Sequence, residues 1–289
     1  MPHRRRLPVS TRHAFALAFD LAFRRDPVHS LVVPLLVRAP WVVASGLLPD
    51  PDSGEVVTAA LVGFATLALV GDFLTFLVIT AMLRVRARSV FNTAPGMRPM
   101  PVGECYATGL RRIPWLFATE SVRNFVLGLM ASFSILPAVF VRLSAETFVH
   151  DLGRNLVLLL VAACLTLPFV LLAGRLAVAT ESVVLDEHDL AGAFQRSWKI
   201  MDGRFERWFE LIASSGLLVL AVALVSAFLT VMFPVLAGPA GASALWLLLI
   251  AITPVIQYAW TFFYLRLIEI EAPLEEVGPA YAEGSGQRA

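Results

Sequence analysis

Charged residues are scarce in this sequence of 289 residues: Asp, Glu, Lys and Arg make up only 16% of it, whereas hydrophobic residues make up 58%. Soluble domains contain about 25% charged and about 45–50% apolar residues. This composition argues against a soluble protein and predicts that lipid replaces water as the solvent over most of the chain. The formal net charge is only +1, so a nucleic-acid partner is not expected either.

Cysteine and lysine are nearly absent as well. The two cysteines, Cys105 and Cys164, fall in segments that we predict to lie in the cytoplasm and inside the membrane, so no disulfide framework is expected. Lys199 is the only lysine, whereas arginines are frequent. We interpret this bias as the codon composition of a GC-rich bacterium.

Catalytic and metal-binding motifs are also missing. The sequence has no phosphate-binding loop, no His-Glu-x-x-His, no Gly-x-Ser-x-Gly and no cysteine pair at metal-binding spacing. No two carboxylates stand at a spacing that suggests acid–base catalysis. His188, within Asp186-Glu187-His188-Asp189, could recruit a metal ion, but a solvated acidic turn before a helix explains this run better. We therefore predict that the protein is not an enzyme and binds no metal ion or cofactor.

The sequence does contain six apolar runs, and a transmembrane helix needs about 20 such residues. The runs cover residues 28–48, 56–83, 115–141, 156–180, 208–236 and 244–268. Basic residues gather in residues 1–26, 84–114 and 181–207, whereas the alternate loops carry few. Because basic residues favour the cytoplasmic side, both termini are predicted there, in a bacterial inner (plasma) membrane. Residues 271–289 are predicted to form a disordered cytoplasmic tail.

Each basic segment holds one copy of a short pattern: small, aromatic, two variable positions, small, large. The copies are Ala14–Phe19, Cys105–Leu110 and Ala193–Trp198, called the motif segments below. The second and sixth positions lie four residues apart and so share a helix face. The pattern predicts an all-α, polytopic membrane domain over residues 1–270, with repeat units 11–83, 101–180 and 188–270. Each unit is expected to be a cytoplasmic interfacial amphipathic helix followed by a transmembrane hairpin. The alternative is that any loop entering a membrane helix looks like this.

The third repeat unit predicts a capped interfacial helix. Asp189 is expected to cap its N-terminus and Gly203 to end it. Three large side chains then share one face, and Trp198 suits the headgroup level of a membrane: Phe194, Trp198 and Met201. We interpret this helix as an interfacial anchor, with a docking site for a partner or a lipid headgroup as the alternative.

The same region resembles a known family. The residues that carry the resemblance are Arg175-Leu176, Glu187, Ala193, Ser197-Trp198 and Gly203-Arg204-Phe205. They are similar to a signature of the membrane domain associated with bacterial glycerophosphoryl diester phosphodiesterases, and of related domains of unknown function. The resemblance implies a six-span membrane module. In related proteins this module can accompany a soluble phosphodiesterase domain, but no residues here match its catalytic part, so that activity is not carried over.

Two groups of charges fall within or beside the predicted spans. Arg38 and Asp72 should lie at similar depths, about 15–18 Å from the cytoplasmic ends of neighbouring antiparallel helices, and we predict an ion pair between them. The pair is either a structural clamp or a gate, proton site or anion site. A second, polar cluster is expected at the cytoplasmic interface, either as snorkelling side chains or as a polar vestibule: Glu120, Arg123, Arg175, Glu206 and Arg207.

These features favour an integral inner-membrane protein of the cell envelope that organises lipids or partner proteins. The expected partners are the bilayer, including anionic lipids at its cytoplasmic face, and other membrane or envelope proteins. The alternative function is a small-solute or lipid transporter, which repeated hairpins around intramembrane charges would suit.

Overall fold

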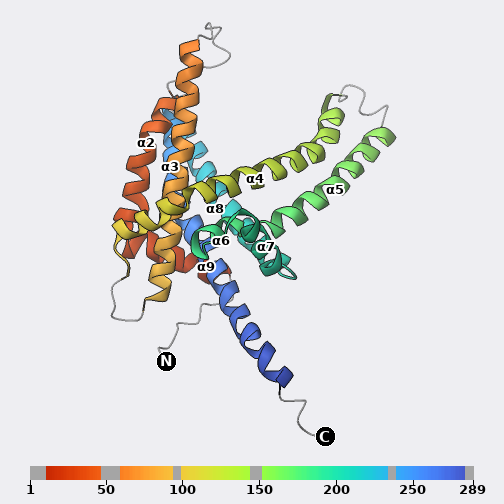
Figure 1. Cartoon of the computed structure of the whole chain (residues 1–289). Coiled ribbons are helices and arrows are strands. Elements are labelled where there is room, and N and C mark those ends of the chain that lie inside the picture. Colours follow the sequence, from red (N-terminus) through yellow and green to blue (C-terminus); the bar gives the residue numbers. More distant parts are fainter. Residues whose placement is uncertain (1–10, 47–58, 94–98, 144–151, 234–238, 284–289) are drawn as a thin grey trace. The chain divides into compact units, whose positions relative to one another are not determined.

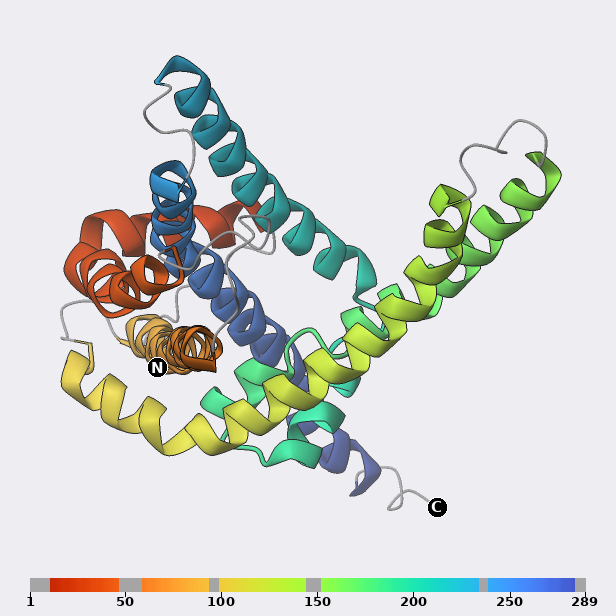
Figure 2. The same ribbon diagram turned by 90° about the horizontal axis from the view of Figure 1, so that it is seen from above.

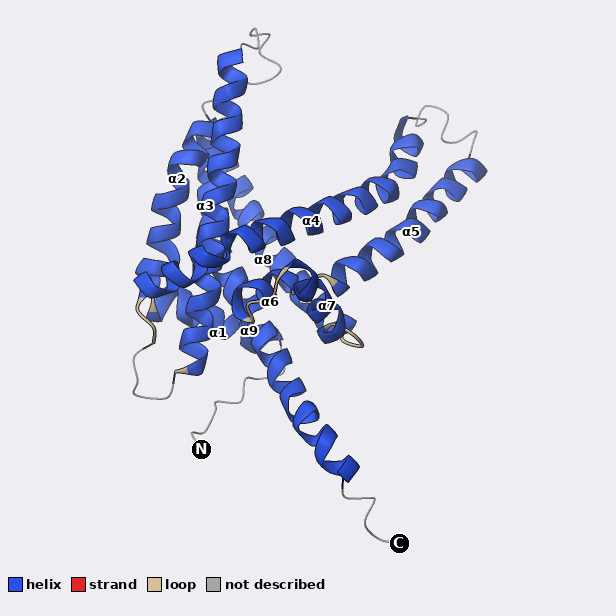
Figure 3. Ribbon diagram, in the orientation of Figure 1, coloured by secondary structure: helices blue, strands red, loops and turns tan. Residues whose placement is uncertain are grey.

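The computed structural model describes residues 11–46, 59–93, 99–143, 152–233 and 239–283, and every regular element in these ranges is a helix (Figures 1 and 3). The all-α prediction is therefore confirmed for the described part of the chain. The helices, of which η1 and η2 are π-helical, are α1 (Thr11–Phe19), η1 (Asp20–Arg25), η2 (Val28–Val32), α2 (Val33–Gly46), α3 (Ala59–Asn92), α4 (Val102–Leu143), α5 (Leu152–Arg175), α6 (Ala179–Leu185), α7 (Leu190–Ile200), α8 (Phe205–Met232) and α9 (Pro239–Glu283).

Within the part of the chain that the structure describes, four helical segments are long and apolar enough to cross a membrane: Ala60–Asn92, Asn155–Leu185, Phe205–Met232 and Leu245–Glu269. The predicted span at residues 28–48 overlaps a shorter apolar helix, Val28–Trp41, and the predicted span at 115–141 lies within α4. Each of the six predicted runs thus overlaps a helix in the described residues. Four of them have the length and composition of a membrane span, which is compatible with a membrane protein, and a total of six spans stays a prediction.

The chain divides into two compact units, where the sequence predicted a single domain. The first compact unit combines Met1–Ile113 with Glu210–Ala289, and the second is Pro114–Phe209. The boundary within α4 falls at Pro114, which lacks the backbone N–H that would continue the hydrogen-bond ladder. The predicted repeat unit 101–180 is therefore divided between the two compact units.

In the first compact unit, α2, α3 and α9 pack against one another, and α1 packs along α9 (Figure 2). Figure 2 views α3 nearly end on, with α2 and α9 beside it. The largest fully buried side chains include Leu77 and Ile79 from α3 and Tyr258 and Tyr264 from α9. Because lipid is as apolar as these side chains, close packing and hydrogen bonds stabilise such a bundle in a membrane more than burial itself.

In the second compact unit, α4 and α5 run side by side, and α6 packs on α7 (Figure 1). The Ser134 hydroxyl of α4 donates a hydrogen bond to the Leu165 carbonyl of α5 at 2.9 Å. The span that contains α5 has a mean hydropathy of 2.9 over its most apolar window, of which only 6% is buried. A helix that is apolar on all sides and barely covered suits a lipid environment.

Two predicted boundaries were wrong. The interfacial segment that begins at residue 101 is not a separate helix, because α4 continues without a break through Pro114 to Leu143. The tail was predicted to be disordered from residue 271, but α9 is helical as far as Glu283. Glu and Ala, which are good helix formers, are frequent in this stretch, although Pro273 and Pro279 are not. The last part of the predicted tail, residues 284–289, lies outside the described residues.

Candidate functional site

The predicted ion pair between Arg38 and Asp72 is present, in the first compact unit. Arg38 Nε lies 2.8 Å from Asp72 Oδ1, and Nη2 lies 2.7 Å from Oδ2, so the pair is bidentate. The guanidinium also lies 5.3 Å from the centroid of the Phe76 ring. The Arg38 side chain is 11% exposed and that of Asp72 is 33% exposed, so the carboxylate is the more accessible partner.

A close approach of α2 to α3 allows this short carboxylate to reach Arg38. Gly71, next to Asp72, faces the Trp41 ring of α2, and a Cβ atom at Gly71 would lie 2.5 Å from that ring. A real Cβ atom does not tolerate such a distance. Glycine at this position therefore permits the helix contact in which the ion pair forms.

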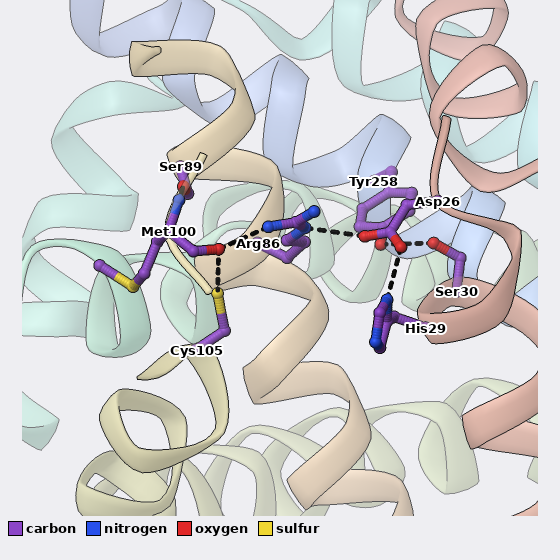
Figure 4. A network of polar contacts seen from close by, with 8 residues as sticks. All are labelled: Asp26, His29, Ser30, Arg86, Ser89, Met100, Cys105 and Tyr258. Carbon is purple, nitrogen blue, oxygen red and sulfur yellow. Dashed lines mark hydrogen bonds and ion pairs between the residues drawn. The ribbon is translucent and has the colours of Figure 1, made fainter. Parts of the chain in front are cut away.

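A second ion pair, between Asp26 and Arg86, also joins the N-terminal helices to α3. Here the N-terminal segment supplies the carboxylate and α3 supplies the guanidinium. Arg86 Nε lies 2.8 Å from Asp26 Oδ2, and His29 Nδ1 lies 2.6 Å from Asp26 Oδ1 (Figure 4). The Asp26 and Arg86 side chains are only 8% and 12% exposed. Our sequence analysis missed this pair because it counted both residues among the loop charges. The sequence separations could have indicated this pair. The separation between Asp26 and Arg38 is nearly equal to that between Asp72 and Arg86, so the two pairs are in register if the segments run antiparallel.

Arg86 extends this network to the start of α4. It donates a second hydrogen bond to the Met100 carbonyl, while the Met100 N–H donates to the Ser89 hydroxyl at 2.6 Å (Figure 4). The Cys105 thiol lies 3.9 Å from the same Met100 carbonyl. Burial raises the pKa of Cys105 above its ordinary value of 9.0, although Arg86 opposes this shift. The thiol therefore stays protonated at neutral pH and is a poor nucleophile.

The α9 helix joins the network through Tyr258. The Tyr258 and Ser30 hydroxyls lie 2.8 Å apart, and both side chains are buried (Figure 4). The Ser30 N–H donates to the Asp26 carbonyl at 3.0 Å. Four segments that are distant in sequence are therefore tied together by one set of polar groups. An arrangement of this kind fixes helix ends and presents no activated nucleophile.

In the second compact unit, Arg175 and Ser197 join the end of α5 to α7. Arg175 Nη1 pairs with Asp202 and donates to the Trp198 carbonyl at 3.3 Å, and its guanidinium lies 5.3 Å from the centroid of the Trp198 ring. The buried Ser197 hydroxyl donates to the Arg175 carbonyl at 2.7 Å and accepts from the Val178 N–H at 3.3 Å. Ser197 thus pairs two backbone groups at the turn that follows α5.

The predicted N-cap of α7 is confirmed, whereas the C-cap is Met201 and Gly203 lies two residues beyond it. The Asp189 side chain accepts a hydrogen bond from the Gly192 N–H at 2.8 Å, and Gly203 has a φ of +67° in the turn after the helix. The prediction of a shared large face was wrong in part. Trp198 is 50% exposed, Phe194 is half-buried and Met201 is buried. The face that packs inward carries mainly smaller residues: Ala193, Ser197 and Ile200.

The predicted polar cluster consists of local pairs. Glu120 and Arg123 form an ion pair one helical turn apart at 2.8 Å, as their spacing suggested. Arg175 is held by Asp202 and Trp198 instead. Glu206 and Arg207 are exposed on the first turn of α8. Snorkelling side chains and a polar vestibule both stay predictions.

The three motif segments share a pattern of burial. Five of their six small positions are buried, and the sixth, Ala14, is half-buried; the buried ones are Ala18, Cys105, Gly109, Ala193 and Ser197. Their large sixth positions are exposed, with Phe19 at 40%, Leu110 at 51% and Trp198 at 50%. A Cβ atom at Gly109 would lie 3.2 Å from the Met82 backbone nitrogen of α3, so small residues permit close docking.

A further repeat feature escaped our sequence analysis. An arginine stands at a similar distance after the first residue of each motif segment. The distance is the same for Arg84 and Arg175, which belong to the first two repeat units, and three residues longer for Arg266 in the third. Each is preceded by an apolar helical run. The segments Leu83-Arg84-Val85, Gly174-Arg175-Leu176 and Leu265-Arg266-Leu267 would have strengthened the predicted repeat.

Within the described residues, no group of three or more His, Cys, Asp or Glu side chains is placed to hold a metal ion. No protein-family model, curated protein or solved structure matches the chain. The resemblance to the phosphodiesterase-associated membrane domain therefore stays a prediction.

Proposed function

We propose that this protein is an integral membrane protein of the bacterial inner membrane that organises lipids or partner proteins and has no catalytic site. In this proposal the six apolar runs span the membrane as three hairpins, with both termini in the cytoplasm. The chain would then belong with the six-span domains that its third repeat unit resembles.

One observation carries the proposal: all three motif segments bury the small residue at their fifth position and expose the large apolar residue that follows it. An exposed Phe, Leu or Trp next to a membrane-spanning helix is costly in water but favourable at the headgroup level of a bilayer. Exposed basic side chains stand beside these residues, including Arg24, Arg111 and Lys199. Cations near the membrane surface attract anionic lipids. Three such segments would give one protein several contacts with the same leaflet.

Reconstitution of the purified protein alone into liposomes tests this function. We expect neither solute flux nor transfer of labelled lipid between leaflets above the rate of protein-free liposomes. A known channel and a known lipid scramblase, reconstituted in parallel, would show that both assays work. Solute or lipid movement that depends on the protein would overturn the organising role.

A transporter is the second candidate function, and the Arg38–Asp72 pair favours it. The Asp72 carboxylate is one-third exposed although the sequence predicts a mid-membrane depth for it. Ionisable groups at that depth usually face a protein interior or a water-filled path. Water access to this pair separates the two functions.

A further inference from the structure

Two phenylalanine rings are stacked on the outer surface of the N-terminal helices. The centroids of Phe19 and Phe23 lie 5.7 Å apart, with 17° between the ring planes. Phe19 is 40% exposed and Phe23 is 47% exposed. Neighbouring exposed rings present a continuous apolar surface, which soluble surfaces tend to avoid outside binding sites.

The outward direction of these rings is fixed by contacts on the opposite face of the segment. Ala18, Leu21 and Ala22 are buried there, and α1 packs along α9. The segment is held at its start by a hydrogen bond of 2.9 Å from the Thr11 hydroxyl to Glu210. At its end it is held by the pair between Asp26 and Arg86. The segment therefore cannot rotate to bury both rings without breaking these contacts.

Exposed cations flank the stacked rings. Arg12 lies near the start of α1, and Arg24 and Arg25 end η1. Arg25 pairs with Asp20 at 2.6 Å. The apolar helix Val28–Trp41 follows directly, so the rings and the cations lie at the point where the chain would enter the membrane. Apolar rings beside arginines match the acyl chains and phosphates of an anionic leaflet.

We propose that the Phe19–Phe23 surface inserts into the headgroup region of the membrane and binds anionic phospholipid, with Arg12 and Arg24 at the lipid phosphates. This proposal rests on the membrane location in the proposed function and names the lipid class and the residues that contact it. It holds equally for an organising protein and for a transporter. A result for or against solute or lipid movement, or against partner organisation, would therefore leave this lipid-binding proposal untouched.

Spin labelling at Phe23 tests the proposal in the full-length protein. Phe23→Cys, in a background with Cys105→Ser and Cys164→Ser, is labelled with a nitroxide and reconstituted into vesicles of phosphatidylcholine with increasing phosphatidylglycerol. Collision rates with oxygen and with a water-soluble nickel chelate then give the depth of the label. Gln195→Cys, at an exposed polar position of α7, is the matched control.

We expect the label at position 23 to lie roughly 5–10 Å below the phosphates. The label at position 195 should stay in water. At a fixed phosphatidylglycerol fraction, adding Arg24→Gln should lower the equilibrium constant for this insertion about fivefold, the effect of losing one basic residue at an anionic surface, whereas Arg24→Lys should not. Free access of the nickel chelate to position 23 would overturn the proposal. A label shielded from both reagents would also overturn it, because a protein segment or a second copy would then cover the rings.

Discussion

At the scale of single residues, Arg86 of α3 binds two other segments of the first compact unit, whereas the predicted Arg38–Asp72 pair joins only α2 to α3. Arg86 neutralises the buried Asp26 and binds the Met100 carbonyl, so its loss leaves a buried carboxylate without its cation. We expect Arg86→Gln to lower the free energy of unfolding by about 3–5 kcal/mol. The measurement is unfolding in mixed micelles with a rising fraction of denaturing detergent.

Arg111→Gln is the control for this variant, because Arg111 is an exposed arginine of the first compact unit, on α4. Its replacement should change the unfolding free energy by less than about 0.5 kcal/mol. Equal losses of unfolding free energy in the two variants would show that the Asp26–Arg86 pair contributes no more to stability than an exposed arginine does.

Cys105 gives a prediction about alkaline pH. Burial raises the pKa of its thiol in the folded protein above 9.0, whereas the unfolded chain ionises near 9.0. The stabilisation from keeping the thiol neutral is therefore complete below pH 9.0 and is lost as the pH rises through the folded pKa. Cys105→Ala should make the decline in unfolding free energy above pH 9 shallower, and Cys164→Ala should not. Parallel curves for wild type and Cys105→Ala would contradict the shift.

Residue patterns predicted one ion pair and missed the other for a physical reason. Arg38 and Asp72 interrupt apolar runs, so each needed a partner and the other was the candidate at matching depth. Asp26 and Arg86 lie at the ends of such runs, where water can satisfy a charge. Only the packing of the helices shows that both side chains are buried.

At the scale of helices, the contact between α2 and α3 depends on a residue without a side chain. Gly71→Ala would place a Cβ atom 2.5 Å from the Trp41 ring, and the helices would have to separate. Overpacking of this kind costs about 1–3 kcal/mol, and we expect this loss in the same detergent unfolding assay.

Gly63→Ala is the matched control, because Gly63 lies in the same helix. A Cβ atom at Gly63 would meet no described atom within 4 Å apart from the neighbouring backbone of its own helix. Alanine is the better helix former, so this change should be neutral or stabilising by up to about 1 kcal/mol. If both substitutions were neutral, the close approach of Trp41 to Gly71 would not be required for stability.

Hydrophobic patterns predicted where helices form better than where they begin and end. Each of the six apolar runs overlaps a helix in the residues that the structure describes, because a long run of this kind has no other way to satisfy its backbone in lipid. The patterns did not show that α4 continues through Pro114, or that α6 forms between α5 and α7. Both features depend on packing and on turn geometry, such as the hydrogen bonds that Ser197 makes after α5.

At the scale of the whole molecule, the described residues contain four helices of membrane-spanning length and composition, whereas the sequence suggests six spans. The repeat of short motif segments predicted a common role for them, and the structure buries the small fifth residue and exposes the large sixth residue in all three. It divides the second repeat unit between two compact units, which local sequence similarity could not predict. The organising role requires that the predicted intramembrane charges stabilise the fold and do not line a path for solutes.

Water access beside Asp72 tests this claim most directly. Thr75 lies one turn from Asp72 in α3 and donates to its carbonyl, so Thr75→Cys reports on this face without breaking the ion pair. With Cys105 and Cys164 replaced by Ser, an impermeant maleimide is added from each side, and Ser53→Cys in the predicted outer loop serves as the reactive control. We predict no labelling at position 75 until the protein is unfolded in detergent. Labelling of the folded protein from either side would reveal an aqueous path to the Arg38–Asp72 pair and would contradict the organising role in favour of transport.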